Sequence, residues 1–279
     1  MKINRIFIST DDNPLYIQFL PMFSLAWQRL LGIKPTVAYV GNLDDKTHWM
    51  KEYCDDIIYY PKHNALPNGR CQTFAARMLM RYLYPDDICM ISDIDMLPLN
   101  GRYFDELLAN YSVEKFVSSG YNAYKFGDGD PKSTIKDPNL RKFPSCYTIA
   151  TGKVWKEIIN PNGLSDSDIV KSWFDIKYFD HKESVNDPNF DDESLMRALI
   201  QKWNPSRDRV IGIDRNIVRT GFMGDRLDRS NWRFNMDMLK GGKYIDAHCP
   251  RPMAKYADSM KLIAGYLDIP FVIGGQCQR

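Results

Sequence analysis

Two carboxylates one residue apart, Asp93 and Asp95, follow the short apolar run at 88–91. Pro85 before this run and Pro98 after it bound a segment that is typical of a buried strand. Side chains alternate between the faces of a strand, so we expect both carboxylates on the same side. Two like charges at the end of a buried strand are costly unless a cation or hydrogen-bond donors meet them. Because Mg²⁺ and Mn²⁺ favour oxygen ligands and often link carboxylates to phosphates, the pair predicts a metal and phosphate site.

Asp-x-Asp is a common pattern in a chain with 35 acidic residues, and most copies lie in solvated loops or cap helices. Four further close acidic pairs sit among polar residues and are expected to be of this kind: Asp11 and Asp12, Asp44 and Asp45, Asp55 and Asp56, Asp128 and Asp130. Asp93 and Asp95 differ from these pairs because they end an apolar run.

The composition is that of a protein with a large core, since 44% of the 279 residues are hydrophobic. No stretch approaches the roughly 18 apolar residues of a membrane span. The apolar run at 3–8 is too short for a signal peptide, so we expect a cytoplasmic protein. Six cysteines without CxxC spacing argue against a zinc knuckle and favour reduced thiols. A net charge of +2 without a dense Lys/Arg stripe leads us to expect no nucleic-acid partner.

The first half of the chain alternates predicted strands with predicted helices. Strands are predicted at 3–9, 35–41 and 57–60, and helices from Pro14 to Leu31 and from Thr73 to Tyr84. This alternation predicts a mostly parallel sheet covered on both faces, with ligands at the carboxyl ends of its strands.

The second half is less regular. Strands are predicted at 116–119 and 146–150, and helices at 154–159, 165–174 and 194–203. The long loop at 127–144 is typical of a lid or a substrate-binding segment.

At the acidic strand the chain resembles glycosyltransferases of the GT-A fold, whose nucleotide-sugar site is marked by an Asp-x-Asp after an apolar strand. The likeness extends in order over residues 3–255: a polar turn after the first strand, a helix before the motif, an acidic triplet opening a later helix, and a late His. The resemblance implies an α/β, Rossmann-like GT-A fold with a mixed, mostly parallel sheet flanked by helices. It implies one catalytic domain over 1–279. About 1–100 would bind the nucleotide sugar, about 101–255 would bind the acceptor and carry catalysis, and 256–279 would form a C-terminal tail.

The resemblance also implies a metal site. Asp95 would bind a divalent ion, Mn²⁺ or Mg²⁺, that bridges the donor diphosphate, and Asp93 would contact the ribose or the same metal through water. His248, which lies in a strand-like segment at 244–250 that ends in Pro250, would be the third ligand, with Asp246 as a fallback. A hydrogen-bonded structural histidine is the alternative for His248.

Further residues are implied to bind the donor. Ser9, Thr10 and Asp11 would hold a uracil edge and ribose hydroxyls, or the same turn would only cap the helix that begins at Pro14. Arg77, on the helix before the motif, would reach the donor phosphate or the acidic pair. Arg70 and Lys62 are alternatives for Arg77. UDP is expected as the nucleotide from the habit of the family.

The acidic triplet Asp191, Asp192 and Glu193 precedes a predicted helix. In inverting members of the family an acidic residue at this place takes the proton of the acceptor hydroxyl, and Asp192 matches that base best. The run from Asp192 to Ser194 also resembles the retaining blood-group-type enzymes, in which Glu193 would be the nucleophile or would stabilise an ion pair. The inverting interpretation is favoured. Acidic residues in a first helical turn also favour the helix macrodipole, which is a structural alternative.

The resemblance predicts a glycosyltransferase that moves a sugar from a nucleotide sugar to a glycan or another hydroxyl acceptor. Tyr147 and Trp155 lie where the family places the acceptor, and would either stack on sugar or pack in the core. A haloacid-dehalogenase-type phosphatase also uses Asp-x-Asp, but places it on the first strand and does not follow it with Met96 and Leu97. A nucleotidyltransferase would need a Gly-rich, Arg-containing N-terminal loop. A nucleotide-sugar-binding module without catalysis is the non-enzymatic alternative.

Overall fold

The computed structural model describes residues 1–41, 45–64, 66, 68–121, 143–173, 192–214 and 224–273. Its strands are β1 Arg5–Thr10, β2 Thr36–Val40, β3 Asp56–Tyr60, β4 Ile88–Ile91, β5 Met96–Pro98, β6 Phe116–Ser119, β7 Thr148–Thr151, β8 Val210–Ile213, β9 Asp225–Asp228 and β10 Tyr244–His248. Its α-helices are α1 Pro14–Ile17, α2 Leu20–Leu31, α3 Gly69–Leu79, α4 Gly101–Leu107, α5 Gly152–Ile159, α6 Asp166–Trp173, α7 Asp192–Trp203, α8 Met236–Lys240 and α9 Ala257–Leu267. Asp191 and most of the predicted loop at 127–144 lie outside the described residues.

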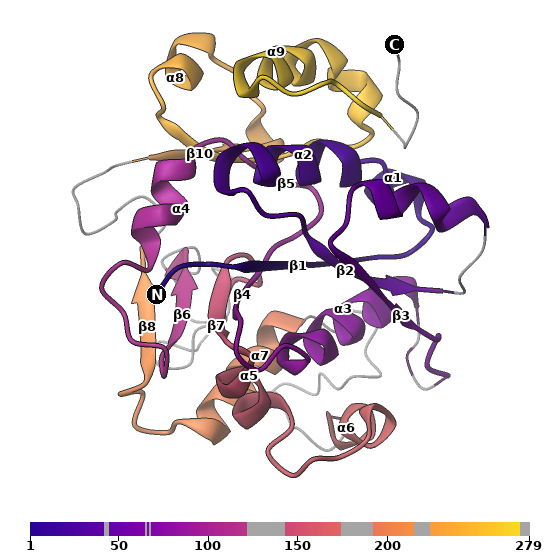
Figure 1. The fold of residues 1–279 in the computed structure, drawn as a ribbon, viewed down its shortest axis with the longest axis vertical. Helices are drawn as coiled ribbons and strands as arrows, with labels where there is room; N and C mark the ends of the chain where they lie inside the picture. The colour runs from indigo at the N-terminus through magenta and orange to yellow at the C-terminus, as the bar shows by residue number, and fades with distance from the viewer. Residues whose placement is uncertain are drawn as a thin grey trace.

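The larger of the two sheets has seven strands in the order β3-β2-β1-β4-β7-β6-β8 (Figure 1). The four strands from β3 to β4 run parallel, and β7 is antiparallel to both of its neighbours. The predicted mixed, mostly parallel α/β sheet flanked by helices is confirmed. In a sheet of this kind the carboxyl ends of the parallel strands meet at one edge.

Two apolar cores cover the two faces of this sheet, because neighbouring residues of each central strand point to opposite sides. In β1, Ile6 and Ile8 pack in the core that contains α2, α4 and α9, whereas Phe7 packs in the core that contains α3, α5 and α7. β2 and β4 divide their side chains in the same way. The continuous apolar runs in the sequence therefore reflect strands buried on both faces.

The helix predicted from Pro14 to Leu31 forms as two helices, α1 and α2, separated at Gln18 and Phe19. It ends as predicted at Gly32, which adopts φ +72°. The helix predicted from Thr73 begins four residues earlier, at Gly69. The cause is Asn68, whose side chain caps the helix by accepting from the Cys71 N–H.

A second, three-stranded sheet in the order β5-β10-β9 lies on the α2 side of the molecule, beneath α8 and α9 (Figure 1). The chain enters it directly from β4, through the turn that carries the acidic pair. Antiparallel pairing places His248 opposite Met96, and parallel pairing places it opposite Asp228. This register brings the end of β10 beside the acidic turn. Among the described residues, no helix combines the length and apolar character needed to cross a bilayer.

Tyr147 and Trp155 are fully buried, so they pack in the core and do not present a face to an acceptor sugar. Tyr147 packs edge-on against Phe104, with ring centroids 5.0 Å apart. The five cysteines within the described residues are buried and form no disulfide bonds with one another. Burial raises the pKa of the Cys54 thiol to about 12, which makes it inert at neutral pH.

Candidate active site

A cavity of about 670 Å³ opens at the carboxyl ends of β1 and β4. The turn after each of these strands, one face of α3, the first turn of α7 and the segments that follow β9 and β10 form its walls. The predicted site residues that fall within the described ranges all line it: Ser9, Thr10, Asp11, Arg77, Asp93, Asp95, Asp192, Glu193 and His248. The fold thus gathers residues from five separate parts of the sequence. Their individual roles stay predictions.

The polar turn after β1 both caps a helix and lines the cavity. The Asn13 side chain accepts from the Leu15 N–H at 3.0 Å, which caps α1, and Asp11 Oδ1 accepts from the Asn13 N–H at 3.1 Å. The start of α3 packs tightly against this turn, because a Cβ at Gly69 would lie 2.8 Å from Asp11 Oδ2. The turn can therefore cap α1 and at the same time present Ser9, Thr10 and Asp11 to the cavity.

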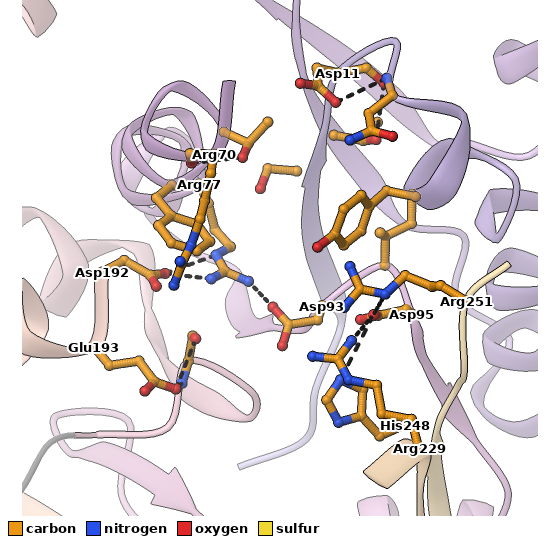
Figure 2. Close-up of a pocket in the computed structure, with 18 residues that line it drawn as sticks. Asp11, Arg70, Arg77, Asp93, Asp95, Asp192, Glu193, Arg229, His248 and Arg251 are labelled. Atoms are coloured by element: carbon orange, nitrogen blue, oxygen red, sulfur yellow. Dashed lines mark hydrogen bonds and ion pairs between the residues drawn. The ribbon is translucent and has the colours of Figure 1, made fainter. Parts of the chain in front are cut away.

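Asp93 and Asp95 lie in the turn between β4 and β5 and not within a strand. Backbone hydrogen bonds fix this turn: Met96 N–H donates to Asp93 O at 3.1 Å, and Cys249 N–H donates to Asp95 O at 2.8 Å. Both carboxylates reach the same cavity, but they point to different partners. Asp93 faces α3, and Asp95 faces the segments that follow β9 and β10 (Figure 2).

Three cationic or imidazole groups surround the Asp95 carboxylate, which is 3% exposed. Its Oδ2 accepts from Arg229 Nη1 at 2.8 Å, and lies 3.7 Å from Arg251 Nε and 3.8 Å from His248 Nε2. Burial and the charge of Asp93 raise the pKa of Asp95, while these three groups oppose the rise. Both arginines line the cavity.

His248 is oriented from behind by a second carboxylate. Its Nδ1 lies 3.5 Å from Asp228 Oδ2, which directs Nε2 toward Asp95. Asp228 is itself fixed by the Ser230 N–H and hydroxyl, at 2.8 and 2.7 Å. Although burial opposes the shift, these hydrogen bonds and His248 lower the pKa of Asp228. A carboxylate that orients one ring nitrogen leaves the other to serve as a ligand, which is a common arrangement at metal-binding histidines.

Arg77 bridges the acidic turn and the first turn of α7. Its Nε and Nη2 donate to Asp192 Oδ2 at 2.9 and 2.6 Å, and its Nη1 donates to Asp93 Oδ1 (Figure 2). Burial disfavours the charged guanidinium, but the two carboxylates outweigh it and raise the pKa of Arg77. Burial likewise opposes ionisation of Asp93, yet Arg77 and His248 lower its pKa. Arg81 lies beneath this group, with its Nη2 3.9 Å from Asp192.

Glu193 lines the cavity beside Asp192 but has different partners. Its Oε1 accepts from the Ser145 backbone N–H at 3.0 Å and from the Ser145 hydroxyl at 3.3 Å. Figure 2 shows the two side chains leaving the start of α7 in different directions, Asp192 toward Arg77 and Glu193 away from it.

Other residues considered from the sequence lie elsewhere. Asp246 is fully buried in a two-bond pair with Arg226, at 2.7 Å for each bond, and does not line the cavity. Lys62 is exposed outside the cavity, whereas Arg70 lines it. Within the described part of the chain, no three side chains of His, Cys, Asp or Glu converge closely enough to hold a metal ion as they stand.

Arg229 and Arg251 are cavity residues that the sequence analysis did not single out. Arg229 belongs to a single 3-10 turn at 229–231, and Arg251 follows His248 by three residues. Arg251 also lies over the ring of Tyr16, with 4.3 Å between the guanidinium carbon and the ring centroid. Its signal in the sequence is an arginine between Pro250 and Pro252, three residues after the histidine that is predicted to belong to the site.

Comparison with known proteins identifies the fold. No protein-family model matches the sequence, and no curated protein is significantly similar to it. The structure of the glycosyltransferase GlyE from Streptococcus pneumoniae TIGR4 aligns with TM-score 0.50 and 9% identity, over 95% of this chain and 63% of the GlyE chain. The galactosyltransferase LgtC, solved in complex with donor and acceptor sugar analogs, aligns with TM-score 0.49 and 15% identity, over 94% of this chain and 95% of LgtC. The likeness to GlyE shows a common fold, and the GT-A fold expected from the sequence is confirmed.

Proposed function

We propose that the protein is a glycosyltransferase that moves a sugar from a nucleotide sugar, with UDP as the expected nucleotide, to a hydroxyl group of a glycan or another acceptor. One observation carries the proposal. A single cavity at the carboxyl ends of β1 and β4 joins the Asp93 and Asp95 pair, His248, two further carboxylates on α7 and several guanidinium groups. The fold shared with a glycosyltransferase supports the same conclusion at the level of architecture.

The guanidinium groups fit a donor diphosphate. Arg70, Arg229 and Arg251 line the cavity on both sides of the acidic turn. Guanidinium groups bind phosphate oxygens through paired, charge-assisted hydrogen bonds, and these bonds stabilise the negative charge that grows on a diphosphate leaving group. The turn formed by Ser9, Thr10 and Asp11 offers hydroxyl and carboxylate groups to a ribose and a base.

The donor groups at the acidic turn suit Mn²⁺ or Mg²⁺. Asp93 and Asp95 supply oxygen ligands, and His248 has one nitrogen fixed by Asp228 and the other directed at Asp95. Asp95 is paired with Arg229, so a metal ion there would take the place of that guanidinium. Such an ion would supply positive charge to the diphosphate as the sugar leaves. Asp93, Asp95 and His248 are the residues that would hold it.

The first turn of α7 supplies the carboxylates for the reaction itself. In an inverting transfer, a carboxylate there accepts the proton of the acceptor hydroxyl while the acceptor oxygen bonds to the anomeric carbon. In a retaining transfer, a carboxylate there stabilises or bonds to the anomeric carbon. From the sequence, Asp192 is favoured as the base of the inverting reaction and Glu193 is the candidate for the retaining one, with Asp191 beside them. Asp192 and Glu193 are thus both candidates for the catalytic carboxylate, and their contacts differ.

A donor panel tests the proposal. The protein is incubated with UDP, GDP, dTDP and CMP sugars, Mn²⁺ and a mixture of oligosaccharide acceptors, and nucleotide release is measured. We expect UDP release that requires the metal and that rises when acceptor is present. Release of inorganic phosphate from sugar phosphates would instead show a phosphatase. Thermal stabilisation by UDP and Mn²⁺ without turnover of any donor would show a binding module. The variant Asp258→Asn, an exposed carboxylate outside the cavity, is the control.

A further inference from the structure

We infer that the two neighbouring carboxylates of α7 have separate roles: Glu193 is the catalytic carboxylate, and Asp192 is a positioning residue that fixes Arg77 and, through it, Asp93. This inference rests on the proposed glycosyl transfer and names the roles of residues within that site. It makes Glu193 the base of the reaction, whereas the sequence alone favoured Asp192 for that role.

The burial of Asp192 is the first observation. Its side chain is 2% exposed, and one of its oxygens, Oδ2, receives both the Nε and the Nη2 of Arg77. Arg81 Nη2 lies 3.9 Å from the same oxygen. A carboxylate held between two buried guanidinium groups is stabilised in its charged form, which makes it a poor acceptor for a substrate proton. It also offers little surface to an acceptor hydroxyl.

The second observation is the geometry of Arg77. The guanidinium carries its N–H groups in a rigid plane, and here Nε and Nη2 bind Asp192 while Nη1 binds Asp93. With two partners in that plane, the guanidinium cannot rotate without losing one of them. Asp192 therefore holds Arg77 in the orientation that fixes Asp93 at the donor end of the cavity. Because α3 and α7 are far apart in the sequence, this contact also joins the two halves of the site.

The third observation is the position of Glu193. It follows Asp192 by one residue, so its side chain leaves the helix about a quarter-turn away and lines the cavity from a different direction (Figure 2). The Ser145 backbone N–H and hydroxyl hold its Oε1, at 3.0 and 3.3 Å. These contacts orient the Glu193 carboxylate within the cavity, whereas the Asp192 carboxylate is buried against Arg77.

The step assigned to Glu193 is a single displacement. The acceptor oxygen forms a bond to the anomeric carbon, and its proton passes to the Glu193 carboxylate. The bond between the anomeric carbon and the diphosphate oxygen breaks, and its electron pair stays on the nucleoside diphosphate. Ser145 holds Glu193 toward the acceptor, while Arg77 and Asp93 hold the donor side.

Two amide substitutions separate these roles. We expect Glu193→Gln to lower kcat about 10²- to 10⁴-fold and to leave the dissociation constant of UDP within about twofold, because it removes a proton acceptor and no donor contact. We expect Asp192→Asn to weaken UDP binding about 10- to 100-fold, because the Arg77 guanidinium loses one of its two charged partners and is no longer held in the orientation that fixes Asp93. UDP binding is measured by calorimetry in the presence of Mn²⁺. Asp258→Asn makes the same change of carboxylate to amide in the first turn of α9, outside the cavity, and serves as the control.

A double-mutant cycle tests the link between Asp192 and Arg77. If Asp192 acts through Arg77, the combination of Asp192→Asn with Arg77→Lys should weaken UDP binding by less than the product of the two single effects. For Glu193→Gln combined with Arg77→Lys, the change in the dissociation constant of UDP should equal the product of the two single changes. Arg77→Lys as a single variant tests the same link if Asp192→Asn does not fold. Because a lysine cannot bridge both carboxylates, this variant should weaken UDP binding without any change at Asp192.

Three results would overturn the inference: a Glu193→Gln variant with kcat within twofold of the unaltered protein, an Asp192→Asn variant that loses kcat with unchanged UDP affinity, or an Arg77→Lys variant with unchanged UDP affinity. Each of these leaves the proposed glycosyl transfer standing. Failure of the unaltered protein to turn over any donor in the panel would instead remove the function on which the inference rests.

Discussion

The guanidinium of Arg229 donates to the Asp95 carboxylate at 2.8 Å, on the same oxygen that lies 3.8 Å from the Nε2 of His248. One of the carboxylates proposed to hold a metal ion is thus already paired with a positive group. Arg229 is 34% exposed, so it can leave for solvent or for a phosphate without exposing a buried charge of its own.

This pairing predicts that Arg229 competes with the metal. We expect Arg229→Gln to tighten Mn²⁺ binding in the absence of nucleotide by about fivefold, the equivalent of about 1 kcal/mol, because the ion need not displace a cation. Electron paramagnetic resonance of free Mn²⁺ measures this affinity directly. The control is Arg233→Gln, an exposed arginine outside the cavity. Equal Mn²⁺ affinity in Arg229→Gln and in the unaltered protein would contradict the competition.

Asp95 itself should be required for ligand binding and not for folding. We expect UDP with Mn²⁺ to raise the melting temperature of the unaltered protein, since a ligand at 100 times its dissociation constant stabilises the folded state by about 2.7 kcal/mol. In Asp95→Asn this rise should be lost, while the melting temperature without ligand changes little because the amide still accepts from Arg229. Differential scanning fluorimetry gives both values. A full ligand-induced shift in the variant would remove Asp95 from the site.

Asp246 offers a contrasting test, because its role is structural. Asp246 is fully buried and Arg226 nearly so, and Asp246→Ala would leave Arg226 without a counter-charge. We therefore expect Asp246→Ala to cost about 3 to 5 kcal/mol in the free energy of unfolding. Urea unfolding measures this loss. At a temperature where the variant is folded, its affinity for UDP with Mn²⁺ should be unchanged. A selective loss of ligand affinity at normal stability would return Asp246 to the list of ligands.

Two glycines make opposite predictions for the same substitution. A Cβ on Gly152 would lie 2.0 Å from the Tyr84 carbonyl oxygen, so Gly152→Ala should force the start of α5 away from the β4 side and destabilise the protein by more than about 2 kcal/mol. Gly265, inside α9, has open space at its Cβ position. Gly265→Ala should therefore stabilise the protein by about 0.5 to 1 kcal/mol. Chemical denaturation measures the change in the free energy of unfolding for each variant. A loss of stability of similar size in both variants would contradict the packing described at Gly152.

The parts of the site that could be predicted from sequence are those attached to strongly patterned elements. Asp93 and Asp95 stand out because they follow a buried strand, and Arg77 because it lies on the amphipathic helix before it. The cause is physical: β4 is buried on both faces, and its continuous apolar run ends abruptly where the cavity begins.

Other elements leave weaker signals. β9 reads Asp-Arg-Leu-Asp, with only Leu227 buried, so its sequence is typical of a loop, and Arg229 just after it carries no periodicity. No helix is predicted at 257–267, although α9 buries Met260, Ile263, Ala264 and Leu267 at helical spacing. The separate environments of Asp192 and Glu193 could not be predicted either. They depend on Arg77 and Ser145, which are distant in sequence and are brought to α7 only by the folded chain.

The turn of Asp93 and Asp95 is where the backbone passes from the seven-stranded sheet into the three-stranded one, and His248 and Arg229 approach it from the smaller sheet alone. A molecule bound in the cavity would therefore contact both layers at once. Such contacts would add to the apolar core that already joins the two sheets, so binding should stabilise their packing as well as the cavity itself.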